Sequence, residues 1–322
     1  MQSHQIGGQE AGQRLDKFLH KYFPMAGSAF LYKMLRKKNI VLNRKKAEGK
    51  ELLQEGDVIC FYFADETYEK FRGKQDAFSQ YKEAFQHLMG ITVIYEDEDV
   101  LILNKPAGIL TQKAEEKDLS LNEWMIGYLL QQKRINEEIL KTFKPSVLNR
   151  LDRNTSGIVL CGISLRGSQA ISKMIHDRSV QKYYAAVVTG RMEKEGVLEG
   201  VWEKDEKTNR VTVSEHGMGK TICTRYRPVK KSEFHTLLSI ELITGKTHQI
   251  RAHMASIGHP LVGDPKYGDP VINEEYRRKY GIRHQLLHAA KIVFPKESSQ
   301  DFAFLGKCFE APLPKEFHKL GF

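Results

Sequence analysis

Apolar and polar positions in the first 64 residues follow the pattern of a small folded unit. Apolar residues between positions 15 and 22 recur at three- and four-residue spacing, which predicts a helix that ends before Pro24. A second helix is expected from Ser28, whose hydroxyl can cap its start. Apolar runs at residues 40–42 and 58–63, separated by turn residues, predict two strands.

Residues 65–88 interrupt this order, because they are charged and only weakly periodic. This pattern predicts a linker, with one short helix near residues 78–88. We therefore divide the chain into an N-terminal unit over residues 1–64, a linker over 65–88 and a larger unit over 89–322.

The larger unit mixes the hydrophobic periods of strands and helices. An acidic turn at residues 96–99 separates two apolar runs and predicts a hairpin. The expected elements are strands at 91–95 and 100–103, a helix at 120–132, a helix at 168–177, strands at 181–190 and 234–243, and a helix that Gly258 ends.

The stretch LNRLDRNTSGIVL, residues 148–160, is a polar turn between two apolar strands. Asp152 stands in this turn between Arg150 and Arg153, whose charges favour the ionised form of its carboxylate. By itself the pattern fits two interpretations. Asp152 is either an Asx-turn residue that accepts hydrogen bonds from backbone amides or a reactive carboxylate that gives electron pairs.

The net charge of +10 indicates a polyanionic partner, with nucleic acid first and an anionic membrane surface second. No apolar run is long enough to span a bilayer, and the first ten residues lack the pattern of a secretory signal. Residues 1–64 hold 11 Lys and Arg against 6 Asp and Glu. A solvated face would explain this basic surplus, and so would binding of phosphates. The candidate phosphate contacts are Lys37, Lys38, Lys45 and Lys46.

Residues 202–221 are polar, basic in patches and interrupted by glycine, which predicts an exposed hairpin. Such a hairpin could lie along RNA, and a solvated loop without contacts fits the same pattern. The basic side chains concerned are Lys204, Lys207, Arg210 and Lys220.

Neither a metal nor a nucleotide cofactor is expected. The four cysteines are far apart, which favours reduced thiols of a cytoplasmic protein over disulfides or a zinc site. Two Gly-Lys-Thr triplets, at 219–221 and 245–247, lack the earlier glycine of a phosphate-binding loop, because Ser214 and Ile240 stand there.

RLDRNTSG, residues 150–157, resembles the catalytic motif of the RluA-type pseudouridine synthases, which modify uridines in ribosomal and transfer RNA. The resemblance implies that Asp152 is the catalytic residue and that Arg150 enters the space left by the flipped uridine. The family usually has histidine where this chain has Asn149.

Three further stretches resemble motifs of the same family, in the same order. Residues 104–108 read NKPAG, for which we expect a structural role, with Lys105 packed near the site and in contact with the RNA. Residues 182–190 match KxYxAxVxG, which implies that Tyr184 stacks on the target base and that Lys182 contacts the RNA. TGKTHQIRAHM, residues 244–254, implies that Arg251 pairs with Asp152. Lys246 and His248 of this last motif are expected to contact RNA, and His248 lies three residues before Arg251, on one side of a helix.

The N-terminal unit resembles the ribosomal-protein-S4-like RNA-binding domain through RLDKFL, the basic helix, VLN and EGDVI. Together the resemblances imply an α+β fold with a mixed, largely antiparallel sheet. They imply an isomerase that acts on structured ribosomal RNA, with transfer RNA as the alternative, as a cytoplasmic monomer without a cofactor.

The implied reaction breaks the glycosidic bond of a uridine, rotates the uracil and rejoins it through carbon. Asp152 attacks the ribose, attacks the ring or abstracts a sugar proton, and the sequence leaves these three first steps open. Two other classes compete with this interpretation. A non-catalytic RNA-binding protein would be marked by loss of Asp152 or Arg251, and a hydrolase would need a second acid or a metal cluster.

Overall fold

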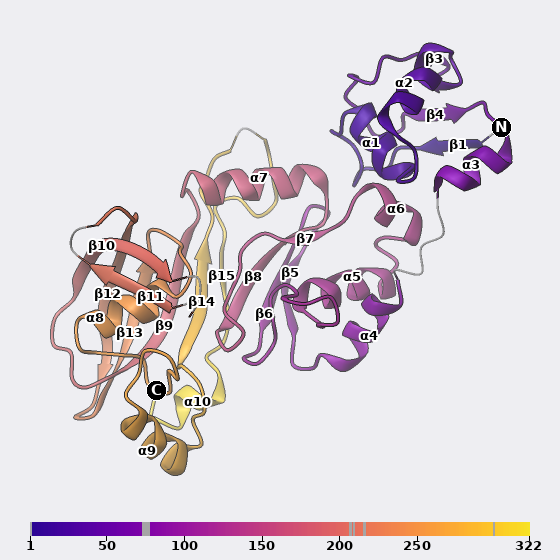
Figure 1. Ribbon diagram of the computed structural model, residues 1–322. Helices are drawn as coiled ribbons and strands as arrows, with labels where there is room; N and C mark the ends of the chain where they lie inside the picture. The colour runs from indigo at the N-terminus through magenta and orange to yellow at the C-terminus, as the bar shows by residue number, and fades with distance from the viewer. Residues whose placement is uncertain (1, 73–77, 206–207, 209, 215–216, 299) are drawn as a thin grey trace.

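The computed structural model describes residues 2–72, 78–205, 208, 210–214, 217–298 and 300–322. Its ribbon shows a small N-terminal unit beside a larger unit that is built on one long sheet (Figure 1). The two units correspond to the two apolar patterns of the sequence, and each has its own core.

The N-terminal unit packs two helices, α1 (Leu15–Tyr22) and α2 (Ser28–Arg36), on a four-stranded antiparallel sheet. Its strands, in the spatial order β1-β4-β2-β3, are β1 (Gln2–Gln5), β4 (Val58–Phe61), β2 (Ile40–Leu42) and β3 (Lys45–Lys46). The rings of Phe18, Tyr22 and Phe61 stack in its core. The predicted helices and strands are confirmed, but the cap is wrong, because Gly27 precedes α2 and Ser28 is its first residue.

The linker expected over residues 65–88 contains two helices, α3 (Asp65–Arg72) and α4 (Ser79–His87), so most of that range is structured. Tyr68 of α3 is buried in the N-terminal core, and its hydroxyl lies 2.7 Å from that of Tyr22. Tyr81 and Ala84 of α4 are buried in the core of the larger unit. Each helix therefore belongs to a unit. The short helix predicted near residues 78–88 is confirmed as α4.

The larger unit has a sheet of eleven strands within the described residues. The strands are β5 (Thr92–Glu96), β6 (Val100–Lys105), β7 (Ser146–Val147), β8 (Ser156–Gly162), β9 (Gln181–Thr189), β10 (Gly196–Asp205), β11 (Arg210–Ser214), β12 (Lys220–Lys231), β13 (His235–Leu242), β14 (Leu287–Val293) and β15 (Cys308–Glu310). The main order is β11-β10-β12-β13-β9-β14-β8-β6-β5, with β7 beside β8 and β15 beside β14. The β8–β14 pair is parallel and the others are antiparallel, which confirms the expected mixed sheet.

Alternate residues of β8 face two different cores, as the strand period of two requires. Val159 and Cys161 pack with α4 and α5 (Leu121–Gln131), whereas Ile158 and Leu160 pack with α7 (Leu165–His176). The helices α5 and α7 were both predicted, although α7 begins three residues earlier than expected. The remaining helices of the unit are α6 (Glu137–Thr142), α8 (Gln249–Ser256), α9 (Pro270–Tyr280) and α10 (Lys315–His318).

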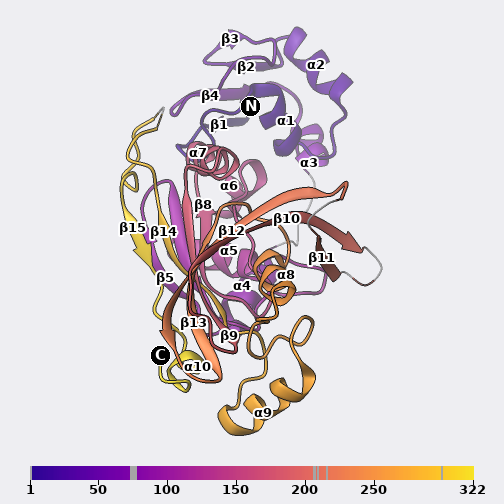
Figure 2. The same cartoon turned by 90° about the vertical axis from the view of Figure 1, so that its left-hand side faces the viewer.

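The two units meet where α1 lies against α6, and the view along the sheet shows the N-terminal unit above α6 and α7 (Figure 2). The buried Glu10 carboxylate accepts a hydrogen bond from the Thr142 hydroxyl of α6, and Arg72 forms an ion pair with Glu138. These contacts fix the N-terminal unit at one end of the sheet.

Candidate active site

The loop between β7 and β8 carries Asp152, and its odd-numbered residues are anchored to the surrounding fold. The Asn149 side chain accepts a hydrogen bond from the Leu160 amide at 2.7 Å and donates to the Ile158 carbonyl at 3.3 Å. The Thr111 hydroxyl donates to the Leu151 carbonyl at 2.8 Å and accepts from the Leu151 amide at 3.1 Å. The Asn149 side chain therefore takes the place of backbone hydrogen bonds between strands at the base of the loop.

The second half of the loop is held in the same way. The Arg153 carbonyl accepts hydrogen bonds from the Lys105 ammonium at 3.0 Å and from the Gly108 amide at 2.9 Å. Gly157 has a φ of 109°, and a Cβ there would lie 2.3 Å from the Ala289 carbonyl oxygen, so glycine is required where β8 meets β14. Arg150 and Asp152, which lie between these anchored positions, line the cleft.

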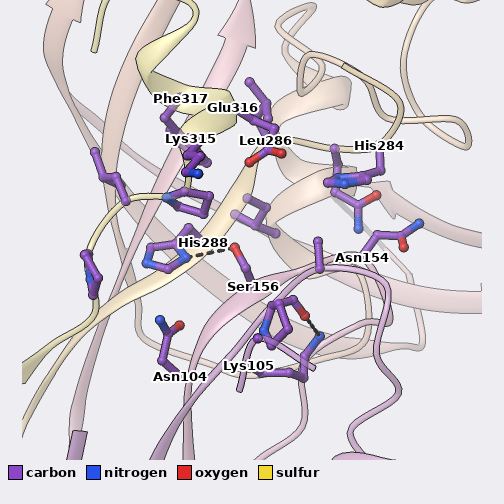
Figure 3. Close-up of a pocket in the computed structure, with 18 residues that line it drawn as sticks. Asn104, Lys105, Asn154, Ser156, His284, Leu286, His288, Lys315, Glu316 and Phe317 are labelled. Carbon is purple, nitrogen blue, oxygen red and sulfur yellow. Dashed lines mark hydrogen bonds between the residues drawn. The ribbon is translucent and has the colours of Figure 1, made fainter. Parts of the chain in front are cut away.

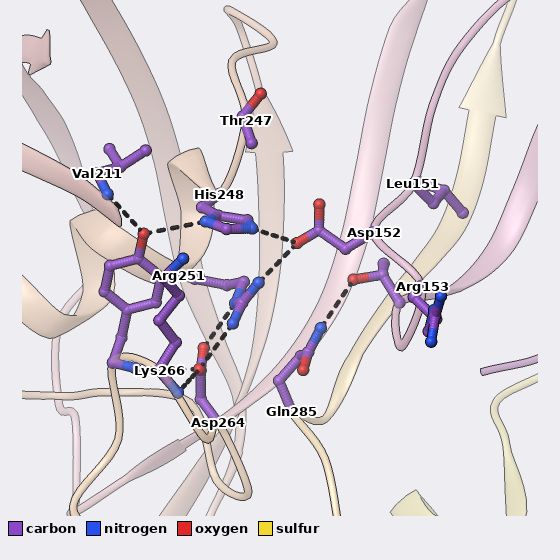
Figure 4. A network of polar contacts seen from close by, with 12 residues as sticks. Leu151, Asp152, Arg153, Val211, Thr247, His248, Arg251, Asp264, Lys266 and Gln285 are labelled. Atoms are coloured by element: carbon purple, nitrogen blue, oxygen red, sulfur yellow. Dashed lines mark hydrogen bonds and ion pairs between the residues drawn. The ribbon is translucent and has the colours of Figure 1, made fainter. Parts of the chain in front are cut away.

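Asp152 is paired with Arg251, as the motifs implied, and Arg251 is held from behind by a second carboxylate. Arg251 Nη1 donates to Asp152 Oδ2 at 2.8 Å, and its Nε and Nη2 donate to the two oxygens of Asp264 at 2.7 and 2.9 Å (Figure 4). The Asp152 side chain is 27% exposed, whereas that of Asp264 is 0% exposed. A substrate can therefore reach Asp152 but not Asp264.

Arg251 and Asp264 keep opposite charges in spite of their burial. Burial disfavours the charge of Arg251, but the hydrogen bonds and charge of Asp264, together with Asp152, outweigh it and raise the pKa of Arg251. Burial acts to raise the pKa of Asp264, but hydrogen bonds from Arg251 and from the Lys266 and Tyr267 amides lower it overall. Arg251 and Asp264 therefore form a preorganised ion pair that orients Asp152.

His248 approaches the same carboxylate from the start of α8. Its backbone lies in the left-handed region, with a φ of 55°, and its Nε2 lies 3.7 Å from Asp152 Oδ2. The Tyr267 hydroxyl oxygen accepts the Val211 amide hydrogen at 2.9 Å and lies 3.0 Å from His248 Nδ1. Tyr267 can donate its own hydrogen to Nδ1, which places the ring hydrogen on Nε2, facing Asp152. Burial lowers the pKa of His248, which favours this neutral form.

Asp152 opens into a cleft of about 780 Å³, into which Tyr184 also projects. Tyr184 is buried, and burial raises its pKa, with the charge of Asp152 acting in the same direction. The predicted contacts Arg150, Lys182, Lys246 and His248 all line this cleft, and Arg150 and Lys246 are exposed. The structure thus brings together the residues of three separate sequence motifs.

Lys105 is placed behind the cleft and not on its surface. It is fully buried, and its ammonium donates to the carbonyls of Pro106, Ile109 and Arg153 at 2.9 to 3.0 Å. Burial lowers its pKa to about 7, against the opposing charge of Asp152. Lys105 therefore has a structural role. The expected RNA contact is wrong for Lys105, because its ammonium is buried and bound to three carbonyls. It borders a separate cavity of about 380 Å³, next to Ser156 and His288 (Figure 3).

Of the basic residues predicted outside the motifs, Lys204 alone among those that the structure describes lines this cleft. Lys37, Lys38, Lys45 and Lys46 are exposed on the N-terminal unit, after α2 and on β3. The predicted hairpin at 202–221 is confirmed as β10 and β11, followed by β12, and its Lys204 lines the cleft. Lys207 lies outside the described residues.

Four residues with clear positions in the site were missed by the sequence interpretation: Asn149 as an anchor, Thr111, Asp264 and Tyr267. An aspartate between glycine and proline, at Gly263-Asp264-Pro265, was the available signal for Asp264, but it is equally typical of a turn. Within the described part of the chain, no cluster of three His, Cys, Asp or Glu residues is arranged to hold a metal ion. No helix described by the structure is long and apolar enough to cross a membrane.

The fold is that of a pseudouridine synthase. A human protein, RNA pseudouridylate synthase domain containing 4, superposes with a TM-score of 0.57 at 19% sequence identity, over 76% of this chain and 97% of that one. At this identity the likeness defines the architecture alone.

The family follows from the sequence comparisons. Residues 99–256 match the family model described as RNA pseudouridylate synthase. The chain is 30% identical to ribosomal large subunit pseudouridine synthase C of Vibrio cholerae, over 96% of this chain and 94% of that protein. It is 28% identical to ribosomal large subunit pseudouridine synthase D of Neisseria meningitidis, over 96% and 78% of the two chains. The chain therefore belongs to the RNA pseudouridylate synthase family and is an isomerase that acts on RNA, which confirms the resemblance to the RluA type.

Proposed function

We propose that this enzyme converts one or more uridines of large-subunit ribosomal RNA to pseudouridine, with Asp152 as the catalytic residue. The observation that carries the proposal is the Asp152 carboxylate, partly exposed in a cleft and held at 2.8 Å by a buried arginine. An oriented carboxylate facing a cleft that can receive a nucleotide is the arrangement that a reaction on an extruded base requires.

Each residue of the cleft has a physical role in the proposed reaction. Asp152 begins it by attack on the ribose or the ring, or by removal of a sugar proton. Tyr184 stacks on the uracil, where a base–aromatic contact contributes about 1–3 kcal/mol. Arg150 fills the gap that the extruded base leaves, which costs a few kcal/mol. Breaking the N-glycosidic bond and forming the C-glycosidic bond is balanced without an oxidant, a reductant or water.

Arg251 serves the same reaction through its two partners. The amides of Lys266 and Tyr267 hold the Asp264 carboxylate, and Asp264 in turn holds the guanidinium. The Nη1 of Arg251 therefore stays directed at Asp152 without a cost of reorganisation. His248 contributes a neutral ring whose Nε2 hydrogen faces the same oxygen.

Ribosomal RNA is proposed as the substrate on two grounds. The Vibrio cholerae and Neisseria meningitidis relatives, at 30% and 28% identity, carry ribosomal large subunit synthase names, and both alignments extend over almost the whole chain. The net charge of +10 and the exposed lysines of the N-terminal unit suit a long structured polyanion.

The N-terminal unit is proposed to be an S4-like RNA-binding domain. Its two helices on a small antiparallel sheet, with exposed Lys37 and Lys38 after α2 and Lys45 and Lys46 on β3, suit binding of a phosphate backbone.

The test is pseudouridine mapping of ribosomal and transfer RNA from cells that lack this protein. We expect one or more large-subunit sites to lose pseudouridine and to regain it when the wild-type protein is restored. Loss at transfer RNA sites alone would contradict the proposed substrate, and an unchanged map of both RNAs would contradict the proposed function.

A further inference from the structure

Lys182 is a cation inside the cleft that has no anionic partner. Its side chain is only partly exposed, and among the described residues no carboxylate or other acceptor binds its ammonium. Burial lowers the pKa of Lys182, and the neighbouring positive charge of Arg178 lowers it further. The contrast with Arg251 is direct, because Arg251 is paired with two carboxylates in the same cleft.

A partly buried, unpaired ammonium is unfavourable in the free protein. Charged groups that lose water are normally paired or hydrogen-bonded, and an unpaired one destabilises the fold. Such a group is most simply explained by an anion that arrives with the ligand. A polar core contact does not explain it, since the described residues supply no acceptor.

We propose that Lys182 is the binding site for a phosphodiester group of the nucleotide whose base enters the cleft. This assignment rests on the proposed function, because it takes RNA as the ligand and the cleft as the seat of the base. It fixes the orientation of the nucleotide in the cleft, because the ring of Tyr184 binds the base and the ammonium of Lys182 binds the backbone.

The geometry of β9 supports this arrangement. Lys182 and Tyr184 are two residues apart on one strand and therefore project from the same face, about 6.6 Å apart along the strand. Both line the cleft with Asp152. The opposite wall is open at Gly245, where an added Cβ would lie 3.6 Å from Lys182 Nζ, so a side chain there would occupy the space beside the ammonium.

The charges around the cleft also favour a phosphate at Lys182. The Asp152 carboxylate is engaged by Arg251, so it does not compete for the ammonium. Lys246, the residue after Gly245, is exposed and lines the cleft, and the charge of Arg178, which follows α7, acts on Lys182. Positive charge therefore gathers around Lys182, where a phosphate would be stabilised.

The test measures the rate at which acetic anhydride modifies Lys182, followed by mass spectrometry of the full-length protein. The probes are uridine 5′-monophosphate and uridine, and exposed Lys296 in the same molecule is the internal control. We expect the monophosphate to protect Lys182 at a concentration about tenfold or more below that required of uridine, as for a hydrogen bond to a charged group. Lys296 should react at one rate throughout.

A variant separates binding from packing. Lys182→Met keeps the length of the side chain and removes its charge, so its thermal midpoint should equal or exceed that of the wild type. Measured by calorimetry, its affinity for the monophosphate should fall to that for uridine, and Lys182→Arg should recover part of the difference. Lys296→Met should behave as the wild type in both measurements.

Equal protection of Lys182 by the two probes, or none by either, would overturn the assignment. A lower thermal midpoint of Lys182→Met with an unchanged preference for the monophosphate would also overturn it, in favour of a packing role. The outcome is separate from that of the proposed function. If the monophosphate protects Lys182 of the wild-type protein but the protein forms no pseudouridine, the phosphate site is supported and the proposed reaction is contradicted.

Discussion

Arg251 and the four lysines of the N-terminal unit carry the same charge in opposite surroundings. Arg251 exposes 6% of its side chain and holds two carboxylates. Lys37, Lys38, Lys45 and Lys46 are exposed, and in the described residues none of them forms an ion pair. A buried, paired charge is fixed in direction and little affected by salt, whereas an exposed one acts at longer range and is screened.

The difference teaches how the molecule divides two tasks that both involve RNA. Orientation of Asp152 needs a charge whose position is settled before the substrate arrives, and Asp264 supplies that at the cost of burying a carboxylate. Capture of a polyanion needs charges that release counterions on contact, and unpaired surface lysines do so. Variants in the two regions should therefore fail in different ways.

The largest effect is expected at Arg251. Arg251→Ala leaves Asp264 as an unpaired buried charge and releases Asp152, so turnover should fall roughly 100- to 1,000-fold, as on removal of one preorganised hydrogen-bond donor. Arg251→Lys should recover little, because an ammonium cannot hold both carboxylates with the same fork. Tritium release from RNA that contains 5-tritiated uridine measures the turnover. Exposed Arg278 on α9 provides the control, Arg278→Ala, and near-normal turnover in both Arg251 variants would show that the pairing is dispensable.

Asp264 comes next, since it acts on the substrate only through Arg251. Asp264→Asn removes one partner of a buried ion pair and should lower the free energy of unfolding by roughly 3–5 kcal/mol. Turnover per folded molecule should fall at least about tenfold, with little change in RNA affinity, because Asp264 does not face the cleft. Urea unfolding and tritium release are the measurements, and exposed Asp301→Asn is the control. Full activity of the folded variant would separate Asp264 from the site.

Substitution of the four N-terminal lysines by alanine should affect binding and spare the chemistry. Each lost phosphate contact should reduce the slope of log affinity against log salt by about 0.7 to 0.9. The measurement is affinity for a structured ribosomal RNA fragment at several salt concentrations. Alanine at exposed Lys173, Lys194, Lys296 and Lys315 removes the same charge elsewhere and should leave more of the slope. Equal losses in the two proteins would mean that only net charge matters.

The smallest effect concerns stability at low pH and lies outside both regions. His288 is fully buried, accepts a hydrogen bond from the Ser156 hydroxyl, and has a pKa lowered by burial to about 4, from 6.5. The unfolded chain binds this proton more readily, so stability should fall as the pH drops from about 6.5 toward 4, by up to about 3 kcal/mol.

His288→Gln should therefore flatten the pH dependence of urea unfolding between pH 7 and pH 4.5, while exposed His176→Gln should leave it unchanged. His253, whose pKa burial also lowers to about 4, will preserve part of the wild-type dependence. Equal slopes in all three proteins would mean that His288 is not buried in its neutral form.

The sequence predicted much of the fold because most elements carry their own period. The helix of α1 and the hairpin of β5 and β6 depend on residues adjacent in the chain. The charged helix α3 did not follow from its pattern, because its only buried side chain, Tyr68, is buried by aromatic rings that come from α1 and β4. The cap of α2 lies one residue earlier than predicted for a local reason, since glycine also serves as a cap residue.

The candidate site likewise contains residues that their own sequence motif predicts and residues that depend on distant contacts. Asp152 and Arg251 could be paired in advance because each stands in a recognisable motif, although 99 residues separate them. Asp264 and Thr111 have no such motif, and their contacts depend on the way in which distant loops meet. The ring of His248, which lies near Asp152, likewise contacts Tyr267, 19 residues away in the sequence.

Tritium release by Asp152→Asn tests the central claim most directly. The substitution keeps the shape of the side chain and removes its charge, while Asp264 continues to hold Arg251. For Asp152→Asn we expect no tritium release above background from RNA that contains 5-tritiated uridine. The circular dichroism spectrum of the variant should be unchanged, and its RNA affinity should be nearly that of the wild type. Substantial release by this variant would contradict the assignment of Asp152 as the catalytic residue.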